Sequence, residues 1–377
     1  MKQLISYYRM PGDREEEISR LIHAEGLDGV ENLIYGSQAG SPPFLQITVG
    51  THLRYWPYWM DLYEGNKDRL FEIFTNQDNI RQMYGAEDRE GWIQVIRANI
   101  RAALAEKPRY LVWHVQESTP EEAFSWRFRH TDEEVLAATA ELYQSFRDLI
   151  PDGVFILFEN IFWPGLYRLE PEKVEYFFTR LDDPAHTGLM FDSGHFMITN
   201  PDLKSEKEAA LYIRECMKRL GKMRALVKGI HLSCSLSGAY IRQFRRGMPV
   251  PLTNQVMMRH ICSLDHHDPF QTRAAREIVE AIEPDYVTHE LFGNTFAEAV
   301  EKARKQALLV TGARKTQVYH SVRLHKHFKE TQIKSLSDFT LEFLCIARNH
   351  LTRIASYLRK AMTKLCIKIL VEFDSAI

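Results

Sequence analysis

Cysteines are scarce in this sequence, which holds five of them among 377 residues. They form no Cys-x-x-Cys pair, and an odd, scattered set suits neither a disulfide framework nor a thiolate metal site. No run of about 18 apolar residues is present, so no transmembrane helix is predicted. The first residues, MKQLISYYRMPGD, lack the apolar core of a signal peptide. These absences together predict a cytoplasmic protein.

Basic residues are in the minority over most of the chain. Residues 1–312 hold 36 Lys and Arg against 45 Asp and Glu, whereas residues 313–377 hold 12 against 5. An acidic body is a poor electrostatic match for a long nucleic-acid duplex, which favours a basic face. We therefore expect a small-molecule or nucleotide-like substrate rather than long duplex DNA.

Short apolar runs rich in β-branched and aromatic residues recur along the first 310 residues. Most of them are continuously apolar rather than alternating, as expected for strands buried on both faces of a parallel sheet. The runs are residues 4–8, 30–35, 44–50, 110–115, 154–160, 187–195, 227–233 and 285–292.

Helical patterns separate nearly all of these runs. The clearest are residues 15–24, 132–150, 171–181, 205–221, 272–282 and 295–310. Eight strands with helices between them predict an α/β fold, a (β/α)8 TIM barrel, because βαβ units force the strands parallel. A doubly wound open sheet is the alternative. No Gly-rich phosphate loop follows any strand, which weakens the dinucleotide-binding version of that alternative.

Two domains are expected, a catalytic barrel over residues 1–312 and a basic helical extension over residues 313–377. The extension would pack on the barrel or on a second subunit of a homo-oligomer. A membrane-surface or nucleic-acid role for it rests on charge pattern alone. Within the barrel, residues 53–91 and 234–270 are long connections after strands 3 and 7. Both leave the carboxyl ends of strands, where barrel enzymes keep their active sites.

Histidines and carboxylates stand at or near the ends of six predicted strands. A barrel would bring them to one axial pocket, although they are far apart in sequence. A further pair, Asp265 and His267, lies between strands 7 and 8. The full set of candidate metal ligands is His52, His114, Glu159, Asp192, His195, His231, Asp265, His267 and Glu290.

Each of these residues alone has an ordinary explanation, such as a satisfied core histidine or a glutamate neutralised by arginine. The set requires a common cause, because isolated buried ionisable groups are too costly to keep. A bound cation supplies one, since it neutralises carboxylates and accepts imidazole lone pairs. Mixed nitrogen and oxygen ligands favour Zn²⁺, Mn²⁺ or Fe²⁺. Nine candidates suggest two or three ions, with Zn or Mn preferred.

At these residues the chain resembles the xylose-isomerase-like TIM barrels, which include endonuclease IV and the sugar isomerases and epimerases. The resemblance covers about residues 1–310 and consists of motif order. Glu159, Asp192, His231 and Glu290 match the four-ligand core of the isomerases and epimerases, in which the two glutamates also act as acid and base. The D-x-x-H of Asp192 and His195 occurs in both branches.

The remaining ligands resemble endonuclease IV, which holds three zinc ions. His52 and His114 match its additional histidines on strands 3 and 4, and Asp265-His266-His267 matches its D-x-H. By this resemblance, Glu159 would bridge two metals and Glu290 would bridge or support the attacking hydroxide. Three features differ: LSCS follows His231, the D-x-H lies further downstream, and the body is acidic. The superfamily also includes enzymes that act on cobamides and nucleotide-like metabolites.

Three functions are therefore weighed: a metal-dependent phosphoester hydrolase, a single-metal sugar or sugar-phosphate isomerase or epimerase, and a non-catalytic binding barrel. The first is preferred. Arg242, Arg245 and Arg246 are candidate phosphate contacts, since arginine forks match phosphate oxygens; a solvated basic helix face is the alternative. Trp56, with its aromatic neighbours, is a candidate for stacking on a ring-bearing substrate, with core or lid packing as the alternative.

Overall fold

The computed structural model describes residues 1–9, 12–34, 42–244 and 247–312. Eight parallel strands close into a barrel in the order β1 to β8, with β8 pairing back onto β1. The (β/α)8 prediction is therefore confirmed, and the open-sheet alternative is wrong. The strands are β1 (Lys2–Tyr8), β2 (Gly29–Leu33), β3 (Thr48–His52), β4 (Tyr110–Val115), β5 (Phe155–Asn160), β6 (Thr187–Asp192), β7 (Val227–His231) and β8 (Tyr286–His289).

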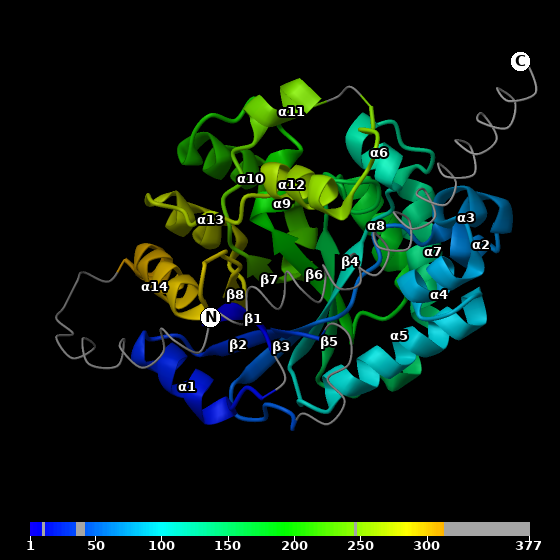
Figure 1. Cartoon of the computed structure of the whole chain (residues 1–377). Helices are drawn as coiled ribbons and strands as arrows, with labels where there is room; N and C mark the ends of the chain where they lie inside the picture. Colours follow the sequence, from blue (N-terminus) through cyan, green and yellow to red (C-terminus); the bar gives the residue numbers. More distant parts are fainter. Residues whose placement is uncertain (10–11, 35–41, 245–246, 313–377) are drawn as a thin grey trace, which may run out of the picture. The chain divides into compact units, whose positions relative to one another are not determined.

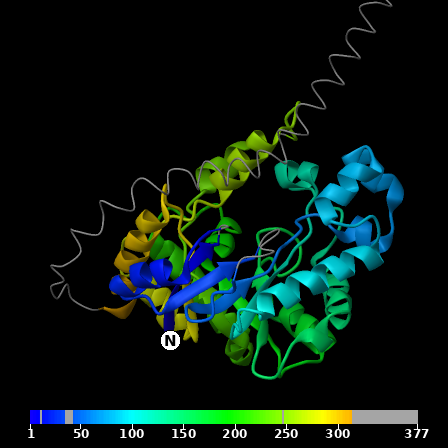
Figure 2. The same ribbon diagram turned by 60° about the horizontal axis from the view of Figure 1, so that its bottom comes forward.

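Helices surround the barrel, as Figure 1 and Figure 2 show from two sides. They begin where the sequence provides caps: Thr131 and Thr295, for example, accept a backbone N–H from the third residue of the helix that each precedes. The helices are α1 (Glu15–Ala24), α2 (Met60–Glu64), α3 (Lys67–Phe74), α4 (Gln77–Tyr84), α5 (Arg89–Leu104), α6 (Pro120–Ser125), α7 (Asp132–Gln144), α8 (Pro171–Leu181), α9 (Ser193–Ile198), α10 (Glu206–Leu220), α11 (Gly238–Phe244), α12 (Asn254–Leu264), α13 (Ala274–Ile282) and α14 (Phe296–Thr311).

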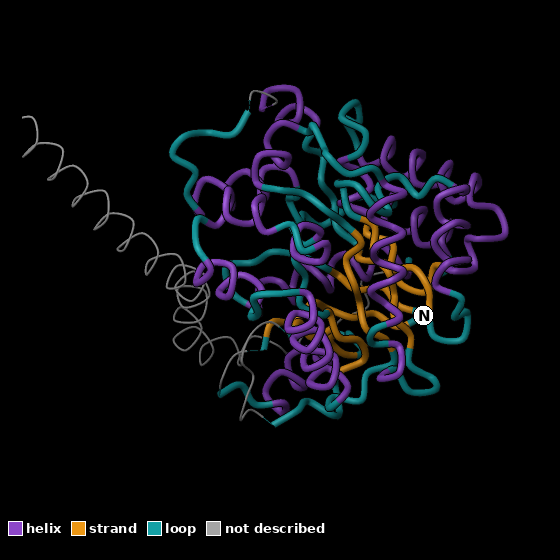
Figure 3. The backbone as a smooth tube through the Cα atoms, turned by 90° about the vertical axis from the view of Figure 1, so that its right-hand side faces the viewer, coloured by secondary structure: helices purple, strands orange, loops and turns teal. Residues whose placement is uncertain are grey.

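The core lies between the strands and this outer layer of helices (Figure 3). Residues of β5 illustrate why the apolar runs are continuous: Ile156 and Phe158 pack outward with the helices, whereas Leu157 fills the barrel interior. Leu4, Val112 and Met190 share that interior with Leu157. These side chains close the barrel below the polar residues at the strand ends, so the barrel is a packed core rather than a pore.

Most strands differ from their predicted bounds by a few residues, and in two of them a side-chain contact gives the reason. The strand predicted over 44–50 begins only at Thr48, because the Glu15 side chain accepts the backbone N–H groups of Gln46 and Ile47 and removes them from the ladder. The run predicted over 187–195 stops at Asp192. The Asp192 carboxylate caps α9 by accepting the His195 backbone N–H at 2.6 Å, so the chain turns into a helix there.

Both long connections leave the carboxyl ends of strands as expected. Helices α2 to α4 follow β3, and α11 and α12 follow β7. Residues 1–252 and 259–312 form one compact unit. The predicted helical extension over 313–377 lies outside the described residues, so the domain boundary at 313 stays a prediction. Among the described helices, none combines the length and the apolar character needed to cross a bilayer.

Candidate metal centre

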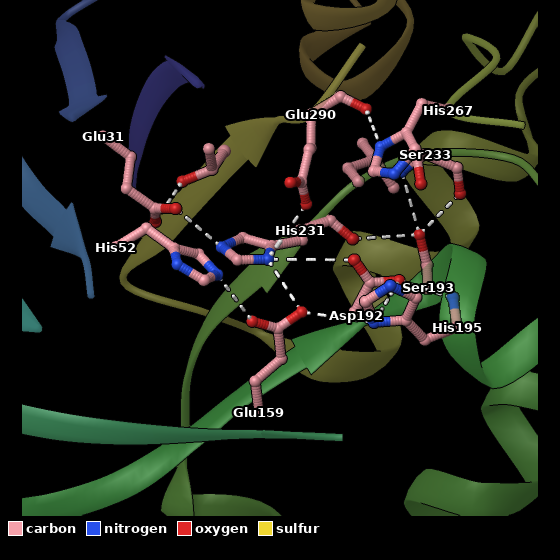
Figure 4. A network of polar contacts seen from close by, with 12 residues as sticks. Glu31, His52, Glu159, Asp192, Ser193, His195, His231, Ser233, His267 and Glu290 are labelled. Carbon is pink, nitrogen blue, oxygen red and sulfur yellow. Dashed lines mark hydrogen bonds and ion pairs between the residues drawn. The ribbon is translucent and has the colours of Figure 1, made fainter. Parts of the chain in front are cut away.

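The ends of six neighbouring strands place the candidate ligands around one point. His52, Asp192 and His231 are the last residues of β3, β6 and β7, and Glu290 directly follows β8. The parallel register sets His114 of β4 opposite Glu159 of β5, and Asp192 opposite His231. Figure 4 shows the side chains of His52, Glu159, Asp192, His231 and Glu290 pointing toward one another from their separate strands.

Three of the side chains form a first group around one oxygen of Glu159. Glu159 Oε2 lies 3.3 Å from His52 Nε2 and 3.2 Å from His114 Nε2, and the two imidazole nitrogens are 2.9 Å apart. Ligand atoms around a tetrahedral ion with bonds of about 2.0–2.1 Å are themselves about 3.3 Å apart. The spacing of this group is therefore close to that of a coordination shell.

A second group shares Glu159 and surrounds His231. His231 Nδ1 lies 3.2 Å from Glu159 Oε1, 3.1 Å from Glu290 Oε2 and 3.7 Å from Asp192 Oδ2. In both groups the candidate ligand atoms all lie within 4.8 Å of one another, the proximity expected of side chains that can hold a metal ion. Glu159, with its side chain 1% exposed, joins the two groups through its two oxygens.

The last three candidate ligands form an adjoining group on Asp265. Asp265 Oδ2 is 3.1 Å from His195 Nε2 and 2.6 Å from His267 Nε2. His195 also connects this group to the others, because its Nδ1 is 3.2 Å from Glu159 Oε1. The long connection after β7 thus returns its D-x-H to the ends of the strands, although the motif lies far downstream of His231.

Each of the five imidazoles contacts a further polar group besides the cluster carboxylates, and in all but His195 that group lies on the ring nitrogen that faces away from them. Nδ1 of His52, His195 and His267 donates to the carbonyl oxygens of Leu53, Asn160 and Glu290, respectively. His114 Nδ1 lies 3.3 Å from the Gln116 amide, and His231 Nε2 lies 2.9 Å from Glu31 Oε1. Such contacts fix the ring orientation and tautomer of metal-ligating histidines.

The chemistry of the donor set fits divalent ions. Among the described residues, both oxygens of Glu159, Asp192 Oδ2, Glu290 Oε2 and His231 Nδ1 are buried without a hydrogen-bond partner. Buried polar atoms rarely stay unpaired. A cation would accept the lone pairs that these atoms direct toward one another. The cluster can therefore hold a metal, through imidazole nitrogens and carboxylate oxygens.

The pKa values of the cluster residues show how strongly its carboxylates favour a positive charge beside them. Burial alone would raise the pKa of Glu290, yet the neighbouring His231 brings it down to about 2. Burial likewise opposes protonation of His267, but the adjacent Asp265 raises its pKa to about 10. In His114 burial prevails and lowers the pKa to about 4. Protons on some histidines thus balance the carboxylates where cations would otherwise do so.

The residues predicted to contact the substrate do not belong to the cluster. Arg242 of α11 donates to the carbonyl of Pro201 and pairs with Asp202, and its side chain is half exposed. Arg245 and Arg246 lie outside the described residues. Trp56 is 4% exposed, donates its indole N–H to Met83 O and packs edge-on against Trp92, so its ring belongs to the core.

Two other aromatic rings lie directly beside the cluster. Tyr55 stacks on His114 with ring centroids 4.2 Å apart, and Phe292 lies 4.2 Å from the His267 ring while remaining 53% exposed. Neighbouring side chains in the aromatic run after β3 point in different directions. Tyr55 faces the strand ends, and Trp56 points into the core.

Sequence analysis missed Glu31 and Ser235. Glu31 is an acid inside the apolar run of β2, and acids and histidines in such runs were the signal for the candidate ligands. Glu31, however, lies before the end of its strand. Ser235 donates its hydroxyl to Asp265 Oδ1 at 2.8 Å and accepts the His266 backbone N–H, so it holds the D-x-H in place. Gly194 leaves room for this contact, since a Cβ there would lie 3.1 Å from Ser235 Oγ and 3.2 Å from Asp265 Oδ1.

Comparisons with known proteins found similarity among solved structures alone. No protein-family model matches the sequence, and no curated protein sequence matches it significantly. The chain is similar to endonuclease IV from Thermus thermophilus, with 12% identity over 83% of this chain and 100% of that one and a TM-score of 0.48.

Two further similar structures are an IolI protein with a bound zinc atom and a D-tagatose 3-epimerase-like protein. The first has 13% identity over 84% of this chain and 100% of that one, with a TM-score of 0.47. The second has 13% identity over 83% and 99%, with a TM-score of 0.44. The barrel fold itself is established by the strand order described above.

Proposed function

We propose that this protein is a metal-dependent enzyme that hydrolyses a phosphoester bond of a small or nucleotide-like substrate. The observation that carries the proposal is the joining of nine histidine and carboxylate residues into three contiguous groups, connected by Glu159 and His195. One ion needs about four ligands. Nine residues with a shared carboxylate therefore suit two or three ions, and such clusters support in-line phosphoryl displacement.

Each group would hold one divalent ion, Zn²⁺ or Mn²⁺ by the mixture of nitrogen and oxygen donors. Bound ions would supply Lewis-acid activation of the phosphoester and of the attacking water. Glu290 is the most exposed of the four carboxylates, with its side chain 18% exposed, and its pKa of about 2 keeps it ionised at neutral pH. We assign Glu290 as the base that would take the proton of the attacking water. The water oxygen would join phosphorus as the ester P–O bond breaks, and Glu290 would pass the proton to the leaving oxygen.

The rings beside the cluster support a substrate that carries a ring. Tyr55 and Phe292 lie against ligands of the first and third groups, respectively, and Phe292 presents an exposed apolar face. We assign substrate stacking to these two residues in place of Trp56. Arg242 is half exposed and engaged with residues 201 and 202, so we retain it only as a phosphate contact to be tested.

A single-metal isomerase or epimerase is the second candidate, and one observation favours it. Glu159, Asp192, His231 and Glu290 form a four-residue group of their own, with two glutamates in contact with the same imidazole. In that function His52, His114, Asp265 and His267 would have no metal to bind. The number of ions per chain therefore separates the two candidates.

The experiment that tests the proposed function counts ions and measures both reactions on the purified full chain. Elemental analysis after loading with Zn²⁺ or Mn²⁺ is expected to give two or three ions per chain. Hydrolysis of bis(4-nitrophenyl) phosphate should require the ions and stop on chelation. One ion per chain, with keto-sugar interconversion and no hydrolysis, would overturn the proposal in favour of the isomerase.

Ser235→Ala is expected to weaken the binding of the ion in the group of His195, Asp265 and His267, and to leave the binding of the other ions unchanged. Without the hydroxyl, Asp265 Oδ1 loses its donor and the carboxylate is no longer fixed toward His195 and His267. Loss of such a supporting contact lowers metal affinity about 10- to 100-fold. Competition with a chromophoric chelator measures the effect. Ser237→Ala is the matched control, since Ser237 is buried nearby and its hydroxyl has no hydrogen-bond partner; equal ion affinities in the two variants would contradict the prediction.

A further inference from the structure

Glu31 is a fully buried carboxylate outside the nine candidate ligands. It lies inside β2 with an exposed fraction of 0%. In the part of the chain that the structure describes, its one ion-pair partner is His231, whose Nε2 lies 2.9 Å from Glu31 Oε1. Because an unpaired buried carboxylate is very costly, this position requires a partner of definite orientation.

Two hydroxyl groups hold the second oxygen of Glu31. Tyr110 Oη donates to Glu31 Oε2 at 2.7 Å, and Thr288 Oγ1 donates to the same oxygen at 3.1 Å. The sequence makes room for the tyrosine at Gly50, where a Cβ would lie 2.1 Å from Tyr110 Cζ. Strands β2, β3, β4 and β8 thus cooperate to fix one carboxylate inside the barrel.

The orientation of Glu31 determines which nitrogen of His231 faces the cluster. Because a carboxylate can only accept, a proton on His231 Nε2 would face Glu31 Oε1, which lies 2.9 Å away as an ion-pair partner. The Nδ1 lone pair is then directed toward Glu159 and Glu290, at 3.2 and 3.1 Å. Figure 4 shows His231 between Glu31 on one side and the cluster carboxylates on the other.

This contact differs from those of the other four imidazoles. His52 and His267 donate to neutral backbone carbonyls, and His114 lies beside an amide. His195 Nδ1 contacts the Asn160 carbonyl and Glu159, which is itself a candidate ligand, so Glu31 differs in being a carboxylate outside the ligand set. A carboxylate acceptor makes an imidazole a more basic ligand than a carbonyl acceptor does, and it also fixes the tautomer. His231 is therefore the histidine of the cluster best prepared to hold a cation.

We propose that Glu31, supported by Tyr110 and Thr288, is a positioning residue that orients His231 and strengthens the hold of the Glu159–Asp192–His231–Glu290 group on its ion. The inference rests on the metal binding in the proposed function, and it holds for hydrolase and isomerase alike. Glu31 itself binds no ion. It acts through the 2.9 Å ion-pair contact with His231 Nε2.

The test is a metal titration of the full chain with Zn²⁺ and Co²⁺ against a chromophoric chelator. Glu31→Gln is expected to weaken one ion about 10- to 100-fold and to change the visible spectrum of the Co²⁺ protein, while the other ions keep their affinity. Glu106→Gln is the matched control. Glu106 is equally buried and pairs with Arg9 and Asn32, so its loss would affect stability and leave metal affinity unchanged.

A second variant tests the same role if Glu31→Gln does not fold. Tyr110→Phe keeps the carboxylate and the ring but removes the donor at 2.7 Å, and we expect a smaller loss of affinity for the same ion, about three- to tenfold. Unchanged affinity and spectrum in both folded variants would overturn the role of Glu31. A wild-type chain that binds ions without hydrolysing phosphoesters would overturn the proposed function and leave this inference standing. A wild-type chain that binds no ion would overturn both.

Discussion

Replacement of Glu159 by Gln is expected to remove two ions and to lower phosphoester hydrolysis about a thousandfold or more. Glu159 is common to the first two groups, with Oε2 facing His52 and His114 and Oε1 facing His195 and His231. A neutral amide keeps the shape but cannot bridge two cations. Metal activation supplies several kcal/mol of transition-state stabilisation, and each 1.4 kcal/mol is a factor of about ten in rate.

The folded state should survive this substitution. In the metal-free protein, burial opposes the charge on Glu159, but the surrounding histidines hold the pKa of Glu159 well below its ordinary value. When the carboxylate is removed, those histidines lose a counter-charge and release protons instead of staying as uncompensated cations. Elemental analysis and thermal unfolding should therefore show lost ions in a cooperative, folded chain.

Glu117→Gln is the control for this prediction. Glu117 lies just beyond β4, is 2% exposed and accepts the backbone N–H groups of Trp59 and Met60 outside the cluster. Burial raises its pKa well above the ordinary value, so a neutral amide closely resembles its preferred state. We expect Glu117→Gln to keep its ions and its rate. If Glu159→Gln retained the wild-type ion content and rate, the bridging role and the hydrolytic proposal would both be wrong.

The barrel and the convergence of its strand ends could be predicted because both follow from local patterns. Continuous apolar runs such as that of β5 indicate strands buried on both faces, and parallel closure brings their carboxyl ends together. His52, Glu159 and Glu290 could be placed at one point from that geometry alone. The end of β6 was less predictable, because the Asp192 carboxylate is both a candidate ligand and the cap that starts α9.

The residues that sequence analysis missed act through contacts that no periodicity encodes. Glu31 lies within a strand rather than at its end, and its importance depends on the 2.9 Å approach of His231 from the opposite side of the barrel. Ser235 gains its role because the connection after β7 returns to it 30 positions later. Which of Tyr55 and Trp56 lies beside the cluster depends on the direction in which each ring points, Tyr55 toward His114 and Trp56 toward Trp92. Such long-range pairings are set by tertiary packing.

Asp265→Asn is expected to have the second large effect. Its result distinguishes a cluster of three ions from a single-ion site. Asp265 Oδ2 is the point on which His195 and His267 converge, at 3.1 and 2.6 Å. Asparagine keeps the contact with Ser235 but presents a neutral group to both imidazoles. If the third group binds an ion used in hydrolysis, the chain should lose one ion and about a hundredfold or more in rate, equivalent to about 3 kcal/mol.

His266→Asn is the matched control, since His266 stands between the two residues of the motif but faces away from the cluster. Its Nε2 lies 3.1 Å from the Ser263 carbonyl, and its side chain is 32% exposed. The isomerase candidate gives the opposite expectation for Asp265→Asn, because the Glu159–Asp192–His231–Glu290 group does not include Asp265. Ion content and hydrolysis measured on the two variants side by side therefore decide the matter. Equal rates and equal ion counts would contradict the prediction and would leave the third group without an ion or a catalytic role.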